Sequence, residues 1–222
     1  MKKVFYIIVC SLLLNSSIAN AQTQNRRFSI FADPQLSWFT SDTKKFSPNG
    51  TVGGFNVGLI ADKYFADRYA VYTGLSINNL GGNIKYNEAG YKLETRDSTY
   101  SITPGTNIKL KAQYLTVPLG LKFKTNQIGY ITFFAQVGVS GHIRLKASAW
   151  DVKDKIDKET ATPQFNLAFA SYNVCAGIEY SLGGPSSVQT GITYSGGFTE
   201  AYKAGHGTVS IGSLSLRIGI VF

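Results

Sequence analysis

Cysteine, histidine and methionine are scarce in this chain of 222 residues, and their scarcity excludes several kinds of chemistry. The only cysteines are Cys10 and Cys175, and the only histidines are His142 and His206. Two histidines cannot supply a metal site with several histidine ligands. A glycine-rich loop of the kind that cradles a phosphate group is missing too. We therefore expect neither a metal ion nor a cofactor.

A long hydrophobic run is also missing. The longest apolar stretch, residues 4–14, is well short of the roughly 20 residues that a membrane-spanning helix needs. Two lysines precede it and an Ala-Asn-Ala sequence at 19–21 follows it, which is the pattern of a secretory signal peptide. We predict cleavage after Ala21, so that residues 1–21 form the signal peptide and residues 22–222 the mature domain. The mature chain then keeps only Cys175 and cannot form an internal disulfide.

The sequence is instead rich in alternating patterns. Charged residues make up only 16% of the chain, while glycine, tyrosine and phenylalanine are abundant, a mixture that suits strands. Every even position from Leu214 to Phe222 is apolar, and a single phase also runs for 16 residues from Ile131 to Lys146. The usual strand of a soluble protein has only about 5 to 6 residues. Six further segments alternate in the same way, which gives eight in all. They cover residues 28–38, 54–65, 69–77, 115–123, 172–180 and 188–194.

Four places disturb the alternation. The apolar set changes phase between positions 110 and 115 and again between 165 and 172. At each of these places we expect a β-bulge or a change from a membrane to a solvent environment. Pro34 and Pro118 lie inside predicted strands, where the missing N–H group removes a ladder hydrogen bond, so the strand register near them stays open.

The connections between the eight segments alternate in length. Short turns lie near residues 66–67, 124–129 and 182–187, whereas long polar segments cover about 39–53, 78–107, 147–164 and 197–208. An even number of strands with this asymmetry is typical of outer-membrane barrels. Aromatic residues, among them Trp38, Trp150, Tyr130 and Tyr180, fall where interfacial girdles belong.

The sequence thus predicts an all-β fold, an eight-stranded antiparallel transmembrane β-barrel of up-and-down meander topology. Short periplasmic turns and longer extracellular loops would connect the strands, and the protein would lie in the outer membrane of a Gram-negative cell. The alternative is a water-soluble barrel of the lipocalin kind, with the two faces exchanged. The polar face carries too few lysines and glutamates for a soluble surface, which favours the membrane barrel.

Two stretches resemble a known family. Residues 54–59 (Gly-Phe-Asn-Val-Gly-Leu) lead through 65–68 (Phe-Ala-Asp-Arg) to 73–75 (Thr-Gly-Leu), and residues 114–122 read Tyr-Leu-Thr-Val-Pro-Leu-Gly-Leu-Lys. They are similar to motifs of the PorT-like outer-membrane β-barrel proteins, small barrels of the porin family with a signal peptide. The resemblance covers essentially the whole mature chain. It implies a barrel and suggests a role in envelope integrity or in the assembly of a secretion apparatus.

The C-terminal end also resembles an outer-membrane protein. Ile220 and the terminal Phe222 are similar to the signal by which such barrels reach the outer-membrane assembly machinery. Arg217 departs from that pattern, since glycine is common at its position.

Five charged residues occupy inward positions of the predicted barrel. Isolated charges are costly in a narrow lumen, so we expect them to pair with one another and brace the barrel. This lumen charge network comprises Asp33, Asp62, Arg144, Glu179 and Arg217. Such a barrel would have a structural or interaction role in the cell envelope; the alternative is a narrow porin-like channel for small solutes.

An enzymatic role is a further hypothesis. Ser140 and His142 lie two residues apart on one strand face, and a lipid-modifying barrel enzyme would need such a nucleophile beside a base. No carboxylate is placed beside them to orient the base, so we predict lumen-lining residues and no catalytic function.

Positive charge exceeds negative charge in the whole chain by +9, and by +7 without the two signal-peptide lysines. The excess in the predicted loops, which includes Lys85, Lys109 and Lys111, would attract lipopolysaccharide phosphates, or would simply be a solvated face. The expected partners are outer-membrane lipid or lipopolysaccharide, the outer-membrane assembly machinery and an envelope protein. We expect a monomer that does not bind nucleic acid.

Overall fold

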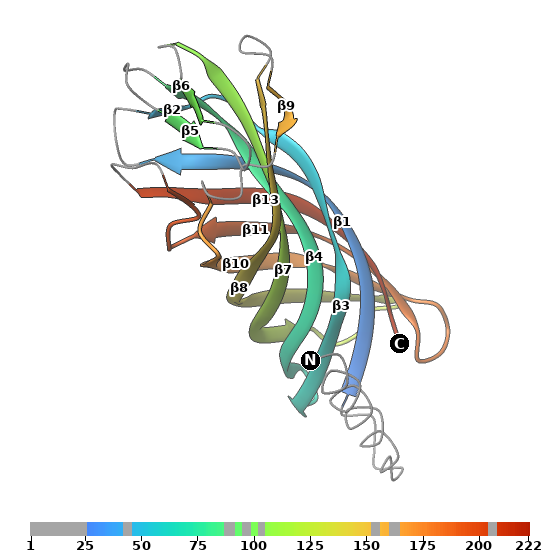
Figure 1. Ribbon diagram of the computed structural model, residues 1–222. Helices are drawn as coiled ribbons and strands as arrows, with labels where there is room; N and C mark the ends of the chain where they lie inside the picture. The colour runs from blue at the N-terminus through green and yellow to red at the C-terminus, as the bar shows by residue number, and fades with distance from the viewer. Residues whose placement is uncertain are drawn as a thin grey trace, which may run out of the picture.

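Eight long antiparallel strands close into a barrel in a computed structural model (Figure 1). The structure describes residues 26–41, 46–86, 92–94, 99–101, 105–151, 156–159, 165–203 and 208–222. The predicted signal peptide lies outside these residues. The barrel strands are β1 (Arg26–Ser41), β3 (Val52–Ala66), β4 (Tyr69–Tyr86), β7 (Asn107–Lys124), β8 (Ile131–Asp151), β10 (Ala168–Ser181), β11 (Ser187–Gly197) and β13 (Thr208–Val221).

Each barrel strand pairs with the one before it in the chain, and β1 pairs with β13 to close the sheet. At the turn end of this closure, Phe28 and Phe222 exchange backbone hydrogen bonds of 2.9 and 2.8 Å. The predicted up-and-down barrel is therefore confirmed. Five short strands lie between the long ones: β2 (Phe46–Pro48), β5 (Lys92–Glu94), β6 (Thr99–Ser101), β9 (Ile156–Glu159) and β12 (Tyr202–Lys203). Among the described residues there is no helix that is long and apolar enough to cross a membrane.

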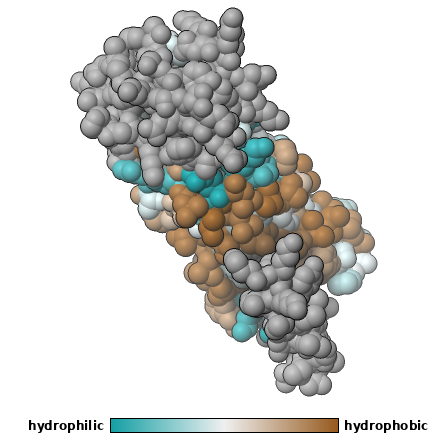
Figure 2. All heavy atoms as spheres, in the orientation of Figure 1, coloured by the Kyte–Doolittle hydropathy of each residue, from teal (hydrophilic) through white to brown (hydrophobic). Residues whose placement is uncertain are grey.

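Apolar side chains cover the outside of the barrel. Leu59, Leu119, Ile192 and Ile220 each expose more than half of their surface. On the face shown in Figure 2, hydrophobic residues form a belt across the middle of the molecule, with hydrophilic residues on its loop side. Leucine and isoleucine exposed in this density are stable facing lipid and costly facing water, so the belt marks the hydrocarbon region.

The strands continue beyond the belt into segments that the sequence assigned to loops. Strand β4 runs on to Tyr86, β7 begins at Asn107, and β8 ends at Asp151. In β7 the inward phase is unbroken, because Ile108, Leu110 and Tyr114 are buried in the same phase as Thr116 and Lys122. The expected phase change at 110–115 is therefore a change of environment within β7: beyond the membrane the lumen becomes apolar and the outer face becomes polar.

A true bulge lies opposite this point, in β8. The register between β7 and β8 shifts between Gln113 and Tyr114, which pair with Lys146 and Arg144 and leave Leu145 without a partner of its own. The second expected phase change lies at residues 165–172. Phe169 and Ser171 both point inward there, so the strand phase is unbroken and the lumen lining changes from apolar to polar.

Both strand prolines interrupt one ladder each. Pro34 pairs with Phe55 of β3, but on the other side the β1–β13 pairing stops at Phe31 and resumes at Gln35. Pro118 pairs with Ser140 of β8, and the β4–β7 pairing is interrupted beside it. A proline lacks only its own N–H, so it opens the ladder on the side to which that group would have pointed.

Candidate functional site

The lumen of the barrel holds the charged and polar residues, arranged in layers. Nearest the turn end, Lys122 Nζ lies 2.6 Å from Asp62 Oδ2 and 2.9 Å from Glu179 Oε1. Lys124 Nζ lies 2.5 Å from the other carboxylate oxygen of Glu179, and Arg27 approaches that oxygen at 3.5 Å. Three cations thus surround two carboxylates. Lys122 is only 1% exposed, and a charge buried so deeply is stable only when it is paired this closely.

A second ion pair lies at mid-height. Arg217 Nε donates to Asp33 Oδ1 at 3.1 Å and to Oδ2 at 2.8 Å, and its guanidinium carbon lies 4.4 Å from the centroid of the Phe31 ring. The backbone N–H of Ile218 also donates to Asp33 Oδ1, at 3.3 Å. That N–H belongs to the stretch of β13 left without ladder partners near Pro34. The Asp33 carboxylate therefore replaces a backbone acceptor at the seam.

Between these ion pairs, uncharged groups cross the lumen. The Tyr72 hydroxyl donates to Asn173 Oδ1 at 2.6 Å, and Asn173 Nδ2 donates to the Ser140 hydroxyl at 2.9 Å. Two glycines make room for the tyrosine, since a Cβ at Gly120 or Gly138 would lie 2.7 or 2.6 Å from its hydroxyl oxygen. These contacts tie opposite walls of the barrel together.

His142 is held between hydroxyl groups above this layer. Its Nδ1 lies 2.8 Å from the Thr116 hydroxyl and its Nε2 lies 2.8 Å from the Ser171 hydroxyl, while the ring stacks on Phe169 with centroids 4.2 Å apart. The serine that contacts the histidine is thus Ser171, whereas Ser140 bonds Asn173. Both partners of the ring are hydroxyls, and His142 is only 3% exposed. The arrangement lacks the carboxylate and the substrate access that a catalytic serine needs.

An apolar core fills the lumen at the loop end. It forms one continuous cluster, with Tyr114 packed edge-on against Phe169 at 5.0 Å between centroids. We call this cluster the apolar plug. Its members are Phe39, Leu80, Ile84, Ile108, Leu110, Ala112, Tyr114, Ala147, Ala149, Phe165, Phe169, Ala201, Val209 and Ile211.

Little free space remains between the plug and the ion pairs. The cavity in the middle of the lumen, lined by residues such as Asp33, Tyr72 and His142, has a volume of about 60 Å³. At about 10–15 Å³ for each water this is room for a few molecules only. A larger cavity of about 650 Å³ opens at the turn end, beside Arg27, Lys124 and Glu179. The described lumen is therefore a vestibule closed by ion pairs, polar contacts and the plug.

The predicted lumen charges are partly brought together. Asp33 joins Arg217, but Asp62 and Glu179 pair with Lys122, Lys124 and Arg27 instead of with other predicted members. Arg144 stands apart at the loop end, where its side chain donates to the Phe165 carbonyl. The alternation contained a signal for Lys122, because it lies between the outward Leu121 and Phe123.

The other predicted residues lie on the outer surface. Tyr130 and Tyr180 contact each other at the turn end with ring centroids 5.9 Å apart, and Trp38 lies 6.4 Å from Tyr194 on the loop side. The side chain of Trp150 is outside the described part of the structure. Ile220 and Phe222 are about half exposed on the outward face of the last strand. Cys175 is buried in the lumen, and no group of three metal-binding side chains occurs among the described residues.

A closed antiparallel barrel with a lipid-facing belt and a polar lumen defines a small transmembrane β-barrel of the outer membrane. The family described as "Outer membrane protein beta-barrel domain" matches residues 20–203, and the chain belongs to this family.

Several solved structures are similar to the structure of this chain. Ail of Yersinia pestis is 17% identical with a TM-score of 0.44, covering 90% of this chain and 100% of its own. Neisserial surface protein A is 14% identical with a TM-score of 0.47, covering 87% and 95%. OprG of Pseudomonas aeruginosa is 12% identical with a TM-score of 0.44, covering 89% and 94%. No curated protein matches the chain.

Proposed function

We propose that this protein is a closed, non-conducting barrel with a structural and interaction role in the bacterial cell envelope. The observation that carries the proposal is the combination of the apolar plug with a mid-lumen cavity of only about 60 Å³. A pathway for ions or polar solutes needs a continuous polar lining, and the apolar layer offers no group to replace lost water. The charges below it are engaged with one another.

The finer role follows from the resemblance to PorT-like proteins. We propose that the protein acts in envelope integrity or in the assembly of a secretion apparatus, after export and cleavage behind Ala21. The barrel then serves as a membrane anchor, and its loop end and vestibule are the surfaces that partners meet. Deletion of the protein, followed by complementation with the wild type, should change and then restore the resistance of cells to detergents.

Single-channel recording tests the closed state. Purified protein is inserted into planar bilayers, and its folded state is checked by heat-modifiable migration in gels. We expect no discrete current steps from the wild type. Regular steps from folded protein would establish the alternative, a narrow channel.

An enzyme is not expected from the surroundings of His142. The wild type and His142→Ala should be equally inactive when each is incubated with phospholipid vesicles and the products are separated. Lipid products from the wild type that disappear in His142→Ala would overturn this expectation.

A further inference from the structure

Four lysines point outward from neighbouring strand ends on one side of the barrel. Lys85 belongs to β4, Lys109 and Lys111 to β7, and Lys146 to β8. The register makes them diagonal neighbours: Lys85 pairs with Asn107, two residues from Lys109, and Lys146 pairs with Gln113, two residues from Lys111. Adjacent strands lie about 4.8 Å apart and alternate residues roughly 7 Å apart, so the four form one ascending stripe. We call it the basic flank.

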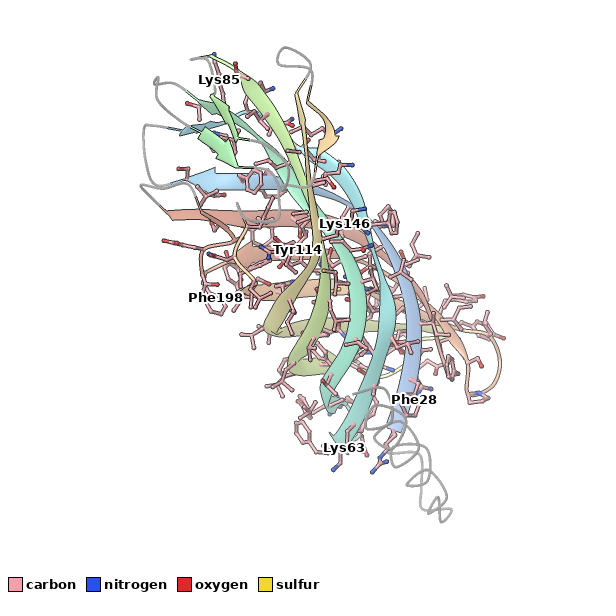
Figure 3. The ribbon with its side chains drawn as sticks, in the orientation of Figure 1. Phe28, Lys63, Lys85, Tyr114, Lys146 and Phe198 are labelled. Atoms are coloured by element: carbon pink, nitrogen blue, oxygen red, sulfur yellow. The ribbon has the colours of Figure 1, made fainter. Side chains whose placement is uncertain are left out.

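The basic flank begins where the lipid-facing belt ends. Leu145, which is 52% exposed, immediately precedes Lys146 in β8. Hydrophilic side chains border the apolar belt on the loop side in Figure 2, and Figure 3 shows Lys146 near mid-height and Lys85 at the far loop end. The lysines thus rise from the level of the lipid headgroups outward, on the extracellular side.

None of the side chains that the structure describes beside the four lysines is acidic. Asp151 ends β8 and Glu159 pairs with Ala149 of β8, and the side chains of both lie outside the described part. The described cross-strand neighbours of the lysines are neutral, among them Asn83 and Gln113, and Ser148 opposite Lys111 is buried. Among the acidic side chains that the structure describes, none forms an ion pair with any of the four lysines. A solvated surface ordinarily mixes both signs, and like charges held this close repel one another. An anionic ligand would remove that repulsion.

The side of the barrel formed by β1, β10 and β11 differs. Trp38, Tyr172 and Tyr194 lie together there on β1, β10 and β11, with ring centroids 6.4 and 6.0 Å apart along the row. These aromatic rings suit the interface without adding charge. At the loop end, the outward positive side chains that the structure describes therefore lie on the flank formed by β4, β7 and β8.

One lysine is already oriented. Lys111 Nζ donates to the Gly53 carbonyl at 2.8 Å, so its side chain reaches from β7 across β4 to β3. The residue opposite Lys111 in β4 is Gly81, which has no side chain to obstruct it. An ammonium has three donors, and the structure records one bond for this one. The remaining donors of Lys111 and the exposed side chain of the neighbouring Lys109 can meet an anion.

We propose that the basic flank binds the phosphate groups of a phosphorylated glycolipid of the outer leaflet, of the lipopolysaccharide class. The apolar belt below contacts the acyl chains of the same molecule, and the lysines engage phosphates at more than one height. This inference depends on the outer-membrane location of the barrel and is independent of whether the lumen conducts.

The test compares unfolding of the full-length mature protein in phosphatidylcholine vesicles of three kinds. The vesicles contain no addition, diphosphorylated lipid A, or lipid A without its phosphates, and unfolding in urea is followed by loss of the heat-modifiable band. A ligand that binds only the folded state raises the urea midpoint. We expect diphosphorylated lipid A alone to raise it, and Lys109→Gln/Lys111→Gln to lose most of that rise.

The matched control removes two positive charges from the other rim. Arg26 and Lys63 are exposed and pair across β1 and β3 at the turn end, so Arg26→Gln/Lys63→Gln should keep the full rise. An equal loss in both double variants would reduce the effect to net charge and overturn the proposal. So would an equal rise with dephosphorylated lipid A, or with inorganic phosphate added to plain phosphatidylcholine vesicles.

Discussion

Arg217 donates from Nε to both carboxylate oxygens of Asp33, across the seam where the last strand meets the first. The pair spans 184 positions of sequence and lies where Pro34 has removed a ladder hydrogen bond. A side-chain contact therefore reinforces the point at which the backbone seam is weakest.

Removal of the Asp33 carboxylate should destabilise the barrel strongly. Asp33→Ala leaves Arg217 buried without its partner, and such losses typically cost about 3–5 kcal/mol. We expect a corresponding decrease in the free energy of unfolding, measured in urea with the protein in vesicles. The double variant Asp33→Leu/Arg217→Met removes both charges and should recover much of the loss. A double variant as unstable as Asp33→Ala would contradict the idea that the orphaned charge is the cause.

Glu179 should be the most sensitive carboxylate of the turn end, because it contacts Lys122, Lys124 and Arg27. Glu179→Gln leaves three cations close together, and only Lys122 keeps an acidic partner, Asp62, so we expect a loss of about 3–5 kcal/mol. Asp67, exposed in the turn between β3 and β4, is the control. Asp67→Asn should change the stability by less than about 0.5 kcal/mol.

Two glycines of β8 should respond oppositely to alanine. A Cβ at Gly138 would lie 2.6 Å from the Tyr72 hydroxyl and 2.4 Å from the Leu119 carbonyl oxygen, whereas a Cβ at Gly141 meets nothing within 4 Å. Gly138→Ala should therefore cost about 1–3 kcal/mol through overpacking. Gly141→Ala should be neutral or stabilising, by about 0.4–1 kcal/mol. Equal effects in urea unfolding would show that the lumen is not tightly packed at Tyr72.

Tyr114 offers a test of the plug. Its ring is fully buried, and its hydroxyl has no hydrogen-bond partner in the described structure. Tyr114→Phe should be neutral or stabilising by about 1 kcal/mol, because an unsatisfied buried hydroxyl is removed. Tyr114→Ala should cost about 3–5 kcal/mol through loss of the ring and the cavity left behind. A strongly destabilising Tyr114→Phe would mean that the hydroxyl makes a contact of its own.

The membrane half of the fold could be predicted from the sequence because one face there is uniformly apolar. In the segment from Leu214 to Phe222 every second residue is apolar, which identifies the outward face. The same kind of alternation around Leu121 and Phe123 places Lys122 in the lumen. The loop half could not be predicted in this way. Ile108 and Leu110 have the same chemistry as outward residues, and only the closed barrel shows that they face inward above the membrane.

The pairing of the lumen charges could not be predicted from the sequence either. Asp62 and Lys122 are 60 positions apart, and their contact depends on the register of three strands. Alternation assigns each residue to a face without giving its height along the barrel. For this reason the alternation predicts Arg144 in the network, although Arg144 lies at the loop end and donates to the Phe165 carbonyl.

The apolar plug has a consequence for whatever approaches the cell surface. Outside the bilayer the barrel is surrounded by water, and burial of apolar side chains from water is favourable. The apolar plug therefore stabilises the loop-side half of the barrel as a hydrophobic core stabilises a water-soluble protein. The strand ends that carry the basic flank are consequently ordered before any encounter. A partner or lipid that binds them does not bear the entropic cost of ordering a loop, and its residence time should depend on contacts alone.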